Sequence, residues 1–597
     1  MRRFIVRVLA VIGGAVVIMV LASLIGVSML YRAKGGERIP EKTIMEINFE
    51  QEFVEYHTDN SVAGVFSPQA PTLRDVLDAM EMAANDKRVV ALVARVGRNT
   101  LGLAQIQEIR DAVLAFRQSG KPAIVHAEAF GEFGPGTGAY YLATAFGEIY
   151  LQPSGDVGLT GLIYETPFVR GTLDKLGVVP RMDHRQEYKS AMNTFTEQKF
   201  TAPHRESTQK VMESQFGQIV KGIATARGLS EDTIRKLTNR GPLSGQEALA
   251  EKLIDGIAYR DEIATKVKEQ AGQDAKALKF TKYLTRADRP HEKGDTIALI
   301  YGVGAVQRGK GSYDPMSGSA GMGSDTVTAA FRAAIEDKEV KAILFRVDSP
   351  GGSYVASDTI WRETLRAKEA GKPVVVSMGN VAGSGGYFVA MSADKIVAQP
   401  GTITGSIGVL AGKMLTNGFW EKVGISWDEV HTSDNATLWT ATHDYTPQQW
   451  GQFQQWLDRV YNDFTTKAAQ GRNLPKEKIL EVAKGRIWTG EDAKAFGLVD
   501  ELGGFPLALS LTKAAAGIAE TADVHLEMFP RKKTSLRQLL LERLLEEEED
   551  DEIDPENPTT VLMRTIQQTQ PIAQLASQLG LAPSPGVLTM PQSRLIQ

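Results

Sequence analysis

The chain contains one segment twice, and this internal repeat restricts the fold more than any other feature of the sequence. The first copy reads GTGAYYLATAFGEIYLQPSGDVGLTGL from residue 136, and the second reads GSGGYFVAMSADKIVAQPGTITGSIGVL from residue 383. A shift of 247 residues aligns Tyr140 with Tyr387 and Pro153 with Pro400. A period of this length is far too long for a solenoid, so it predicts two similar domains in tandem.

The repeat and its flanks predict the domain organisation. We assign residues 43–285 to the first copy, 286–295 to a linker and 296–530 to the second copy. Residues 531–597 would follow as an acidic C-terminal tail. We predict that this tail is partly disordered, because its run of neighbouring like charges repels itself.

The N-terminus has the pattern of a membrane anchor. A short basic stretch, residues 1–7, precedes 24 residues from 8 to 31 that carry no charge. About 20 apolar helical residues span a bilayer, so this run is long enough to cross once. The alternative is a cleaved signal peptide, for which residues 26–28 offer a passable cleavage site. We predict an uncleaved transmembrane helix at 8–31, followed by a linker over 32–42.

The composition argues against several kinds of chemistry. The chain has no cysteine, which removes disulfides, thiolate nucleophiles and cysteine-ligated metals. It has only eight histidines and no H-E-x-x-H motif, so metal catalysis has little support. A net charge of −5 gives no electrostatic reason to expect nucleic acid as a partner. We therefore predict no metal, no cofactor and no nucleic-acid partner.

Expected strands and helices alternate in both copies. In the second copy, apolar strands are expected at 296–303, 342–347 and 373–378, with helical patterns between them. The first copy begins the same order with a strand at 43–49. This alternation predicts an α/β fold with a parallel sheet, in which sites gather beyond the carboxyl ends of strands. Two glycine-rich pieces fall there, namely DSPGGS and an expected turn, GNVAGSGG.

The two copies differ at two positions that together would make one site. The second copy has Ser384 where the first has Thr137, and the first copy has Lys189 where the second has Ala436. A serine needs a base to become a nucleophile, and burial lowers the pKa of a lysine toward neutrality. This reciprocal loss predicts a Ser–Lys site assembled from both copies.

Backbone amides near Ser384 complete the expected chemistry. Gly351 and Gly352 follow a strand, and glycine lets a backbone amide approach a substrate closely. The helix expected after Ser384 offers further amides to an oxyanion. His184 and His431 align across the repeat and provide an alternative base. Because both copies contain them, we interpret these histidines as structural strand positions.

Five pieces of the sequence carry a resemblance to a known family: FRVDSPGGS, GKPVVVSMGNVAGSGGY, TITGSIGV, EYKSA and RIWTGEDAKAFGLVDELG. With them, residues 43–530 resemble the long, tandem form of the signal peptide peptidase A family, which are membrane-anchored bacterial serine proteases of the S49 type. The resemblance implies two ClpP/crotonase-like domains and a homotetramer. It also implies a place in the bacterial inner membrane, as a single-pass protein with the catalytic part in the periplasm.

The resemblance assigns roles to individual residues as well. Ser384 would be the nucleophile, Lys189 the general base, and Ser406 the residue that orients the lysine. The amides of Gly352 and Gly385 would bind the oxyanion. The implied substrates are signal-peptide remnants and other short apolar peptides.

Two other functions fit part of the pattern. Crotonase-fold acyl-CoA hydrolases and hydratases share oxyanion glycines, but they give no reason for the pair of Ser384 and Lys189 or for a membrane anchor. A non-catalytic membrane scaffold built on a decayed protease is the other alternative. Our prediction is a membrane-anchored serine endopeptidase that works through an acyl-enzyme without a cofactor.

Overall fold

The computed structural model of the chain describes residues 38–57, 70–98, 100–311, 313–314, 319–531 and 588–589. The predicted anchor at 8–31 and nearly all of the predicted acidic tail lie outside these ranges. Among the described residues, no helix is both long and apolar enough to cross a membrane.

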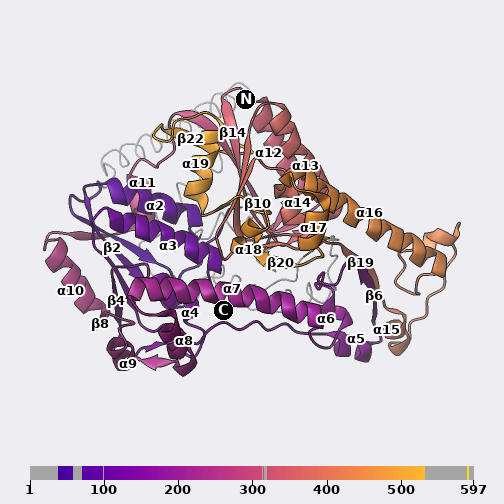
Figure 1. Cartoon of the computed structure of the whole chain (residues 1–597), viewed down its shortest axis with the longest axis horizontal. Helices are drawn as coiled ribbons and strands as arrows, with labels where there is room; N and C mark the ends of the chain where they lie inside the picture. Colours follow the sequence, from indigo (N-terminus) through magenta and orange to yellow (C-terminus); the bar gives the residue numbers. More distant parts are fainter. Residues whose placement is uncertain are drawn as a thin grey trace, which may run out of the picture.

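The first half of the chain builds a six-stranded sheet, which lies at the left of Figure 1. Its strands follow the order β8-β4-β3-β2-β1-β9, and every neighbouring pair is parallel. The strand expected at 43–49 is therefore confirmed, as an interior strand between β2 and β9. The bounds are β1 (Thr43–Asn48), β2 (Val89–Arg95), β3 (Ala123–Ala127), β4 (Glu148–Leu151), β8 (Gly256–Ile257) and β9 (Lys276–Lys279).

The second half repeats this order of strands. The path β21-β17-β16-β14-β10-β22 corresponds strand for strand to β8-β4-β3-β2-β1-β9, and its neighbours are again parallel. The three strands expected in this copy are confirmed, and the chain has the predicted α/β fold with parallel sheets. The bounds are β10 (Asp295–Val303), β14 (Val340–Ser349), β16 (Val374–Gly383), β17 (Lys395–Ala398), β21 (Glu501–Leu502) and β22 (Val524–Phe529).

One local expectation was wrong. We expected GNVAGSGG to be a turn, but β16 continues through Gly383 and only then gives way to helix α14 (Gly385–Ala390). The extension has its own partner, because β16 also pairs in parallel with β18 (Ile403–Gly405). β18 in turn pairs with β20 (Ile487–Thr489). Ladder hydrogen bonds therefore keep a glycine-rich stretch extended until the residue before Ser384.

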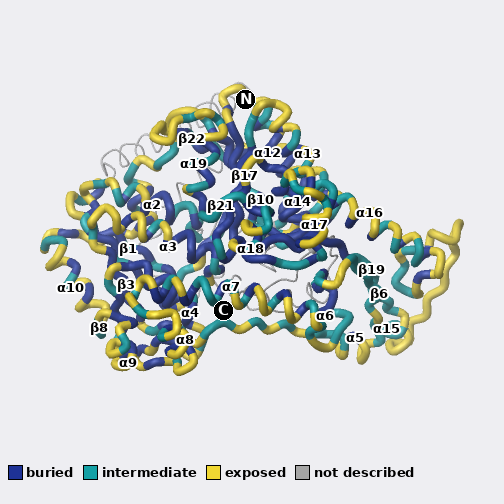
Figure 2. The backbone as a smooth tube through the Cα atoms, viewed as in Figure 1, coloured by how far each residue is buried: buried dark blue, intermediate teal, exposed yellow. Residues whose placement is uncertain are grey.

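A hydrophobic core joins the two halves. It runs from the first sheet through helices α2 (Leu73–Asn85), α3 (Leu103–Gln118) and α19 (Phe505–Ala515) to the near face of the second sheet. A second core lies on the other face of that sheet, under α12 (Ser324–Glu336) and α13 (Tyr354–Glu369). Figure 2 shows both sheets as largely buried. Because the first core contains residues from both copies, the two sheets pack as parts of one body.

Two long helices and a small sheet bring the copies together a second time. Helices α7 (Ala202–Arg227) and α16 (Pro447–Arg472) have 26 residues each, and both carry a threonine N-cap. In Figure 1 both extend toward the two-stranded sheet at the right. That sheet pairs β6 (Val179–His184) of the first copy with β19 (Leu410–Leu415) of the second, antiparallel. The residues that follow β6 are thereby carried to the second copy.

Candidate active site

Ser384 lies where β16 ends and α14 begins. Its backbone has φ 54° and ψ −116°, a conformation that residues with a side chain rarely adopt. The Ser384 amide donates to the Gly405 carbonyl at 2.8 Å, and the Ser384 carbonyl accepts from the Phe388 amide at 2.9 Å. These hydrogen bonds hold the strained turn on both sides. A strained strand-to-helix turn of this kind presents its side-chain hydroxyl in a fixed direction.

Lys189 contacts Ser384 from the other copy. The Lys189 ammonium donates to Ser384 Oγ at 2.8 Å and to the hydroxyl and carbonyl oxygens of Ser406 at 3.0 Å each. The three acceptors match the three donors of an ammonium group. In the neutral amine, the nitrogen can instead accept the proton of Ser384. The structure thus brings together the three predicted side chains, and it does so within one chain.

Burial sets the charge of Lys189. Only 1% of this lysine is exposed. Burial lowers the pKa of Lys189 from 10.5 to about 7, and no charged neighbour contributes to this shift. A large fraction of the amine is therefore neutral at neutral pH, and the neutral amine is the form that accepts a proton.

Two glycines of the second copy make room for Lys189. A methyl group added to Gly485 would lie 2.6 Å from Lys189 Cβ, and one added to Gly408 would lie 3.1 Å from Lys189 Cδ. The neighbouring Tyr188 amide donates to the Lys484 carbonyl at 3.1 Å, which fixes the segment on the second copy. Neither glycine was predicted to belong to the site, because the role of both depends on a side chain that is distant in sequence.

The predicted oxyanion glycines lie side by side. Gly351 and Gly352 form the short strand β15, and Gly351 has φ 98°. A side chain on Gly352 would collide with the Val306 carbonyl at 2.1 Å. A methyl group on Gly385 would lie 2.9 Å from the Gly352 nitrogen. The backbones of Gly352 and Gly385 therefore approach each other directly beside Ser384, and only residues without a side chain fit there.

Asp348 binds the part of β16 that leads to Ser384. The register between β14 and β16 shifts just before the site. The Asp348 carboxylate accepts from the Val381 amide at 3.0 Å inside this irregularity. Burial, with a smaller contribution from Glu55, raises the pKa of Asp348 to about 7. The role of this aspartate, the first residue of DSPGGS, could not be predicted from the sequence, because a shift in strand register leaves no sequence pattern.

A buried ion cluster holds β14 against the first copy. The Arg346 guanidinium lies 3.0 Å from the Glu55 carboxylate and 2.8 Å from the Glu108 carboxylate. Arg346 is 2% exposed, and both glutamates precede Lys189 in the first copy. Removing one partner of a buried ion pair costs about 3–5 kcal/mol, because a charge is left without compensation. The cluster therefore fixes the strand that leads to Gly352 relative to the copy that supplies Lys189.

The corresponding position in the first copy is already saturated with hydrogen bonds. The Thr137 hydroxyl donates to the Gly161 carbonyl at 2.9 Å. It also accepts from the amides of Thr160 at 3.2 Å and Gly161 at 3.0 Å. With its hydroxyl engaged by backbone groups on all sides, Thr137 has a structural role.

The histidines that align across the repeat differ in their surroundings. His184 ends β6, as expected, and its ring contacts the Gln186 carbonyl at 2.7 Å. The same expectation was wrong for His431, which lies in an exposed irregular segment with its ring 3.6 Å from Glu429. β6 gains its strand partner β19 from the other copy, whereas the segment around His431 forms no strand among the described residues.

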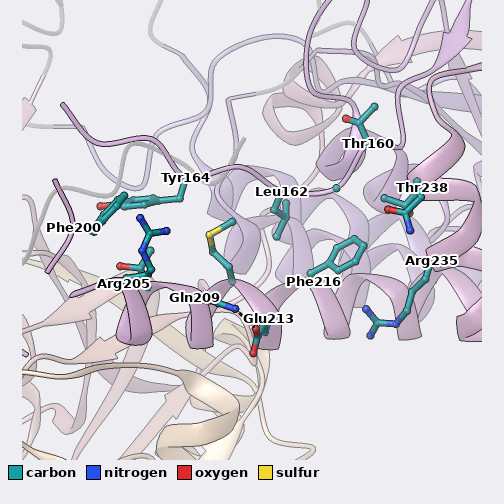
Figure 3. Close-up of a pocket in the computed structure, with 14 residues that line it drawn as sticks. Thr160, Leu162, Tyr164, Phe200, Arg205, Gln209, Glu213, Phe216, Arg235 and Thr238 are labelled. Atoms are coloured by element: carbon teal, nitrogen blue, oxygen red, sulfur yellow. Dashed lines mark hydrogen bonds between the residues drawn. The ribbon is translucent and has the colours of Figure 1, made fainter. Parts of the chain in front are cut away.

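A cavity elsewhere in the structure is not lined by the predicted catalytic residues. A cavity of about 520 Å³ lies along α7, between Tyr164 and Phe200 at one end and Phe216 and Arg235 at the other (Figure 3). Neither Ser384 nor any residue in contact with its hydroxyl lines it. Within the ranges that the structure describes, no group of three or more acidic or histidine side chains is placed to hold a metal ion.

Comparison with known proteins assigns the family. The sequence model for peptidase family S49 matches residues 115–274 and 366–519, which together make up more than half of the chain. The chain belongs to peptidase family S49. This S49 peptidase is 32% identical to the chloroplast serine protease SPPA of Arabidopsis thaliana, over 77% of this chain and 68% of the relative.

Bacterial relatives support the same class of enzyme. The S49 peptidase is 32% identical to Protease 4 of Salmonella typhi, over 78% of this chain and 75% of the relative. It is 31% identical to Protease 4 of Haemophilus influenzae, over 80% and 79% of the two chains. The enzyme is therefore a serine protease, and its relatives include the long form of the family.

Proposed function

We propose that this serine protease is a membrane-anchored endopeptidase that cuts short apolar peptides, including signal-peptide remnants, with Ser384 as nucleophile and Lys189 as general base. The contact of 2.8 Å between Lys189 Nζ and Ser384 Oγ carries this proposal. The uncharged run at 8–31 supports the single-pass anchor. The periplasmic location, the homotetramer and the tandem ClpP/crotonase-like domains follow from the family resemblance, and the matching strand orders of the two sheets support the duplication.

The geometry suggests an acyl-enzyme route. The neutral amine of Lys189 takes the proton of Ser384 while Ser384 Oγ attacks the peptide carbonyl. The amides of Gly352 and Gly385 stabilise the negative oxygen that forms. The resulting ammonium of Lys189 then gives its proton to the leaving amine, and the acyl-enzyme remains. Water repeats the attack on the ester carbon, with Lys189 as base, and the proton returns to Ser384 as the acid product leaves.

Replacing Ser406 with alanine tests the positioning of the base. The variant loses one of the two contacts that Ser406 makes with the amine, while the backbone carbonyl contact remains. We expect kcat to fall by about 10- to 100-fold with little change in KM, because the lost interaction orients a proton acceptor. Steady-state kinetics on a short apolar reporter peptide measure both constants.

The matched control for Ser406→Ala is Ser392→Ala. Ser392 is also buried, but its hydroxyl accepts from the Trp361 indole at 2.7 Å. This control should keep the parental kcat. A rise in KM at unchanged kcat for Ser406→Ala would instead place Ser406 in substrate binding.

The pH dependence follows from the pKa of the base. Only the neutral amine of Lys189 accepts the serine proton, and burial lowers the pKa of Lys189 to about 7. The active fraction therefore grows as pH rises through this value, so kcat/KM should increase along one limb with a midpoint near 7 and then level off. Reporter hydrolysis from about pH 5 to 10 measures the limb. A midpoint near the ordinary lysine pKa, or activity that falls across this range, would contradict the assignment.

A further inference from the structure

The edge of β15 beside Ser384 pairs with a strand from the far end of the chain. On one side β15 pairs in parallel with β11 (Ala305–Gln307). On its other side it pairs antiparallel with β23 (Leu588–Thr589), which is the last strand of a five-stranded sheet. In this register, Gly351 faces Thr589 and Gly352 faces Leu588.

This edge has the properties of a site for extended peptides. A peptide that adds to a sheet edge is held mainly by main-chain hydrogen bonds, and its side chains can vary. Gly351 and Gly352 present only backbone, and the Gly352 nitrogen lies against the first residue of α14, directly after Ser384. A peptide strand on β15 therefore passes next to the nucleophile, as attack on its carbonyl requires.

We propose that the outer edge of β15 is the peptide-binding edge of the protease, and that the chain's own strand Leu588–Thr589 occupies it when no substrate is bound. The C-terminal segment is then a tethered competitor of substrates. This inference rests on the proposed function, because it takes Ser384 as the centre of the site.

The sequence of the segment suits this role. Between Pro585 and Pro591 lie only Gly-Val-Leu-Thr-Met, which are apolar or β-branched apart from the glycine. Val587 and Thr589 are β-branched and favour the extended conformation. Proline cannot donate to a strand ladder, so the two prolines limit main-chain pairing to the residues between them. The piece also has the character of the short apolar peptides proposed as substrates.

The connection is long enough for the contact to form within one chain. Arg531 lies two residues after the end of β22. Residues 532–587 connect it to Leu588. An extended chain covers about 3.3 Å per residue, so the separation imposes no limit on reach. A ligand tethered to its site experiences an effective concentration of up to about a millimolar. Substrates must compete with it, which raises the apparent KM and leaves kcat unchanged.

Two prolines in the strand test the inference in the full-length protein. Neighbouring residues of an antiparallel ladder alternate between hydrogen-bonded and non-hydrogen-bonded pairs, so only one of the two residues donates its amide to β15. Replacing both, Leu588→Pro with Thr589→Pro, removes that amide whichever residue carries it. We expect the apparent KM for a reporter peptide to fall by about threefold or more at unchanged kcat. The matched control, Gln567→Pro with Gln568→Pro, puts two prolines in the same tail and should keep the parental KM.

A chain that ends at Arg531 should show the same lower KM, since both hydrophobic cores are built from residues 39–529. A parental KM in both the Leu588→Pro/Thr589→Pro variant and this truncated chain would overturn the inference. The change in KM should not depend on enzyme concentration. A dependence on concentration would assign the strand to a second copy of the chain and would also overturn the tethered arrangement.

A binding measurement separates this inference from the proposed catalysis. In the Ser384→Ala background, a fluorescent peptide SPGVLTMPQSRLIQ, the sequence of residues 584–597, should bind the chain truncated at Arg531 and should bind the full-length chain much more weakly. Fluorescence anisotropy reports this without any turnover. Equal binding to both chains, with hydrolysis by the parent intact, overturns the tethered strand alone. Selective binding to the truncated chain, with no hydrolysis by the parent, supports the strand edge and overturns the proposed function.

Discussion

Ser384→Ala should lower kcat/KM for peptide hydrolysis by about 10⁴-fold or more, and the protein should keep its fold. The large effect is expected because the Ser384 hydroxyl is the group that attacks the peptide and carries the acyl intermediate in the proposed route. The fold is expected to survive because alanine keeps the β-carbon and removes a single buried oxygen, whose partner Lys189 retains two contacts with Ser406. Reporter hydrolysis, together with circular dichroism and the thermal midpoint, measures both parts of the prediction.

Thr137→Ala is the matched control for Ser384→Ala, since Thr137 occupies the corresponding position in the first copy. It should retain hydrolysis within about twofold and lose about 1 kcal/mol of stability, because the amides of Thr160 and Gly161 lose an acceptor. Hydrolysis at the parental rate by folded Ser384→Ala would remove this serine from the mechanism.

Lys189→Arg should be as inactive as Lys189→Ala, with kcat/KM reduced by about 10³-fold or more at every pH up to 10. A guanidinium keeps its proton throughout this range and cannot act as base, although it preserves the positive charge. Lys199 lies ten residues further along the chain and is exposed, so Lys199→Arg is the matched control and should be fully active. His431→Ala and His184→Ala should also keep activity. Full activity of a folded Lys189→Ala protein would exclude the dyad.

The stability of a Lys189 variant gives a readout that does not depend on turnover. Because the pKa of Lys189 is about 7 in the folded protein and 10.5 in the unfolded chain, the unfolded chain binds more protons between these values. The free energy of unfolding should therefore rise with pH across this window. Below about pH 7 the buried amine is charged in the folded protein, and the parent is destabilised by the full amount. Lys189→Met has no titrating group at this position and therefore lacks this pH-dependent destabilisation. Its thermal midpoint relative to the parent should be higher at pH 6 than at pH 10.

Much of the fold could be predicted from the sequence, because parallel strands buried on both faces appear as short apolar runs. The strand at 342–347 is one example: it is the centre of β14, and the structure extends it only by a few residues on each side. The extension of β16 to Gly383 was not predictable in the same way. Glycine has a low strand propensity, and the partner that keeps it extended, β18, lies about twenty residues further on.

The site also has residues that could be predicted from the sequence and residues that could not. Ser384 and Lys189 could be proposed because each copy lacks one of them, and that difference is visible in the sequence. The glycines that admit the lysine, Gly408 and Gly485, could not, since their role depends on contacts across the two copies. The same holds for the ion cluster at Arg346, because charged residues distant in sequence give no local signal of burial.

The most direct test of the central claim is labelling with a fluorophosphonate, followed by mass spectrometry of the labelled peptide. This reagent reacts with an activated serine hydroxyl, so it reports the pair of Ser384 and Lys189 without any assumption about the substrate. It also separates a protease from a scaffold, which has no activated serine. We expect one adduct, on Ser384, that forms faster at pH 8 than at pH 6 and is absent in Lys189→Arg. An adduct on a different serine, or labelling of Ser384 at the parental rate in Lys189→Arg, would contradict it.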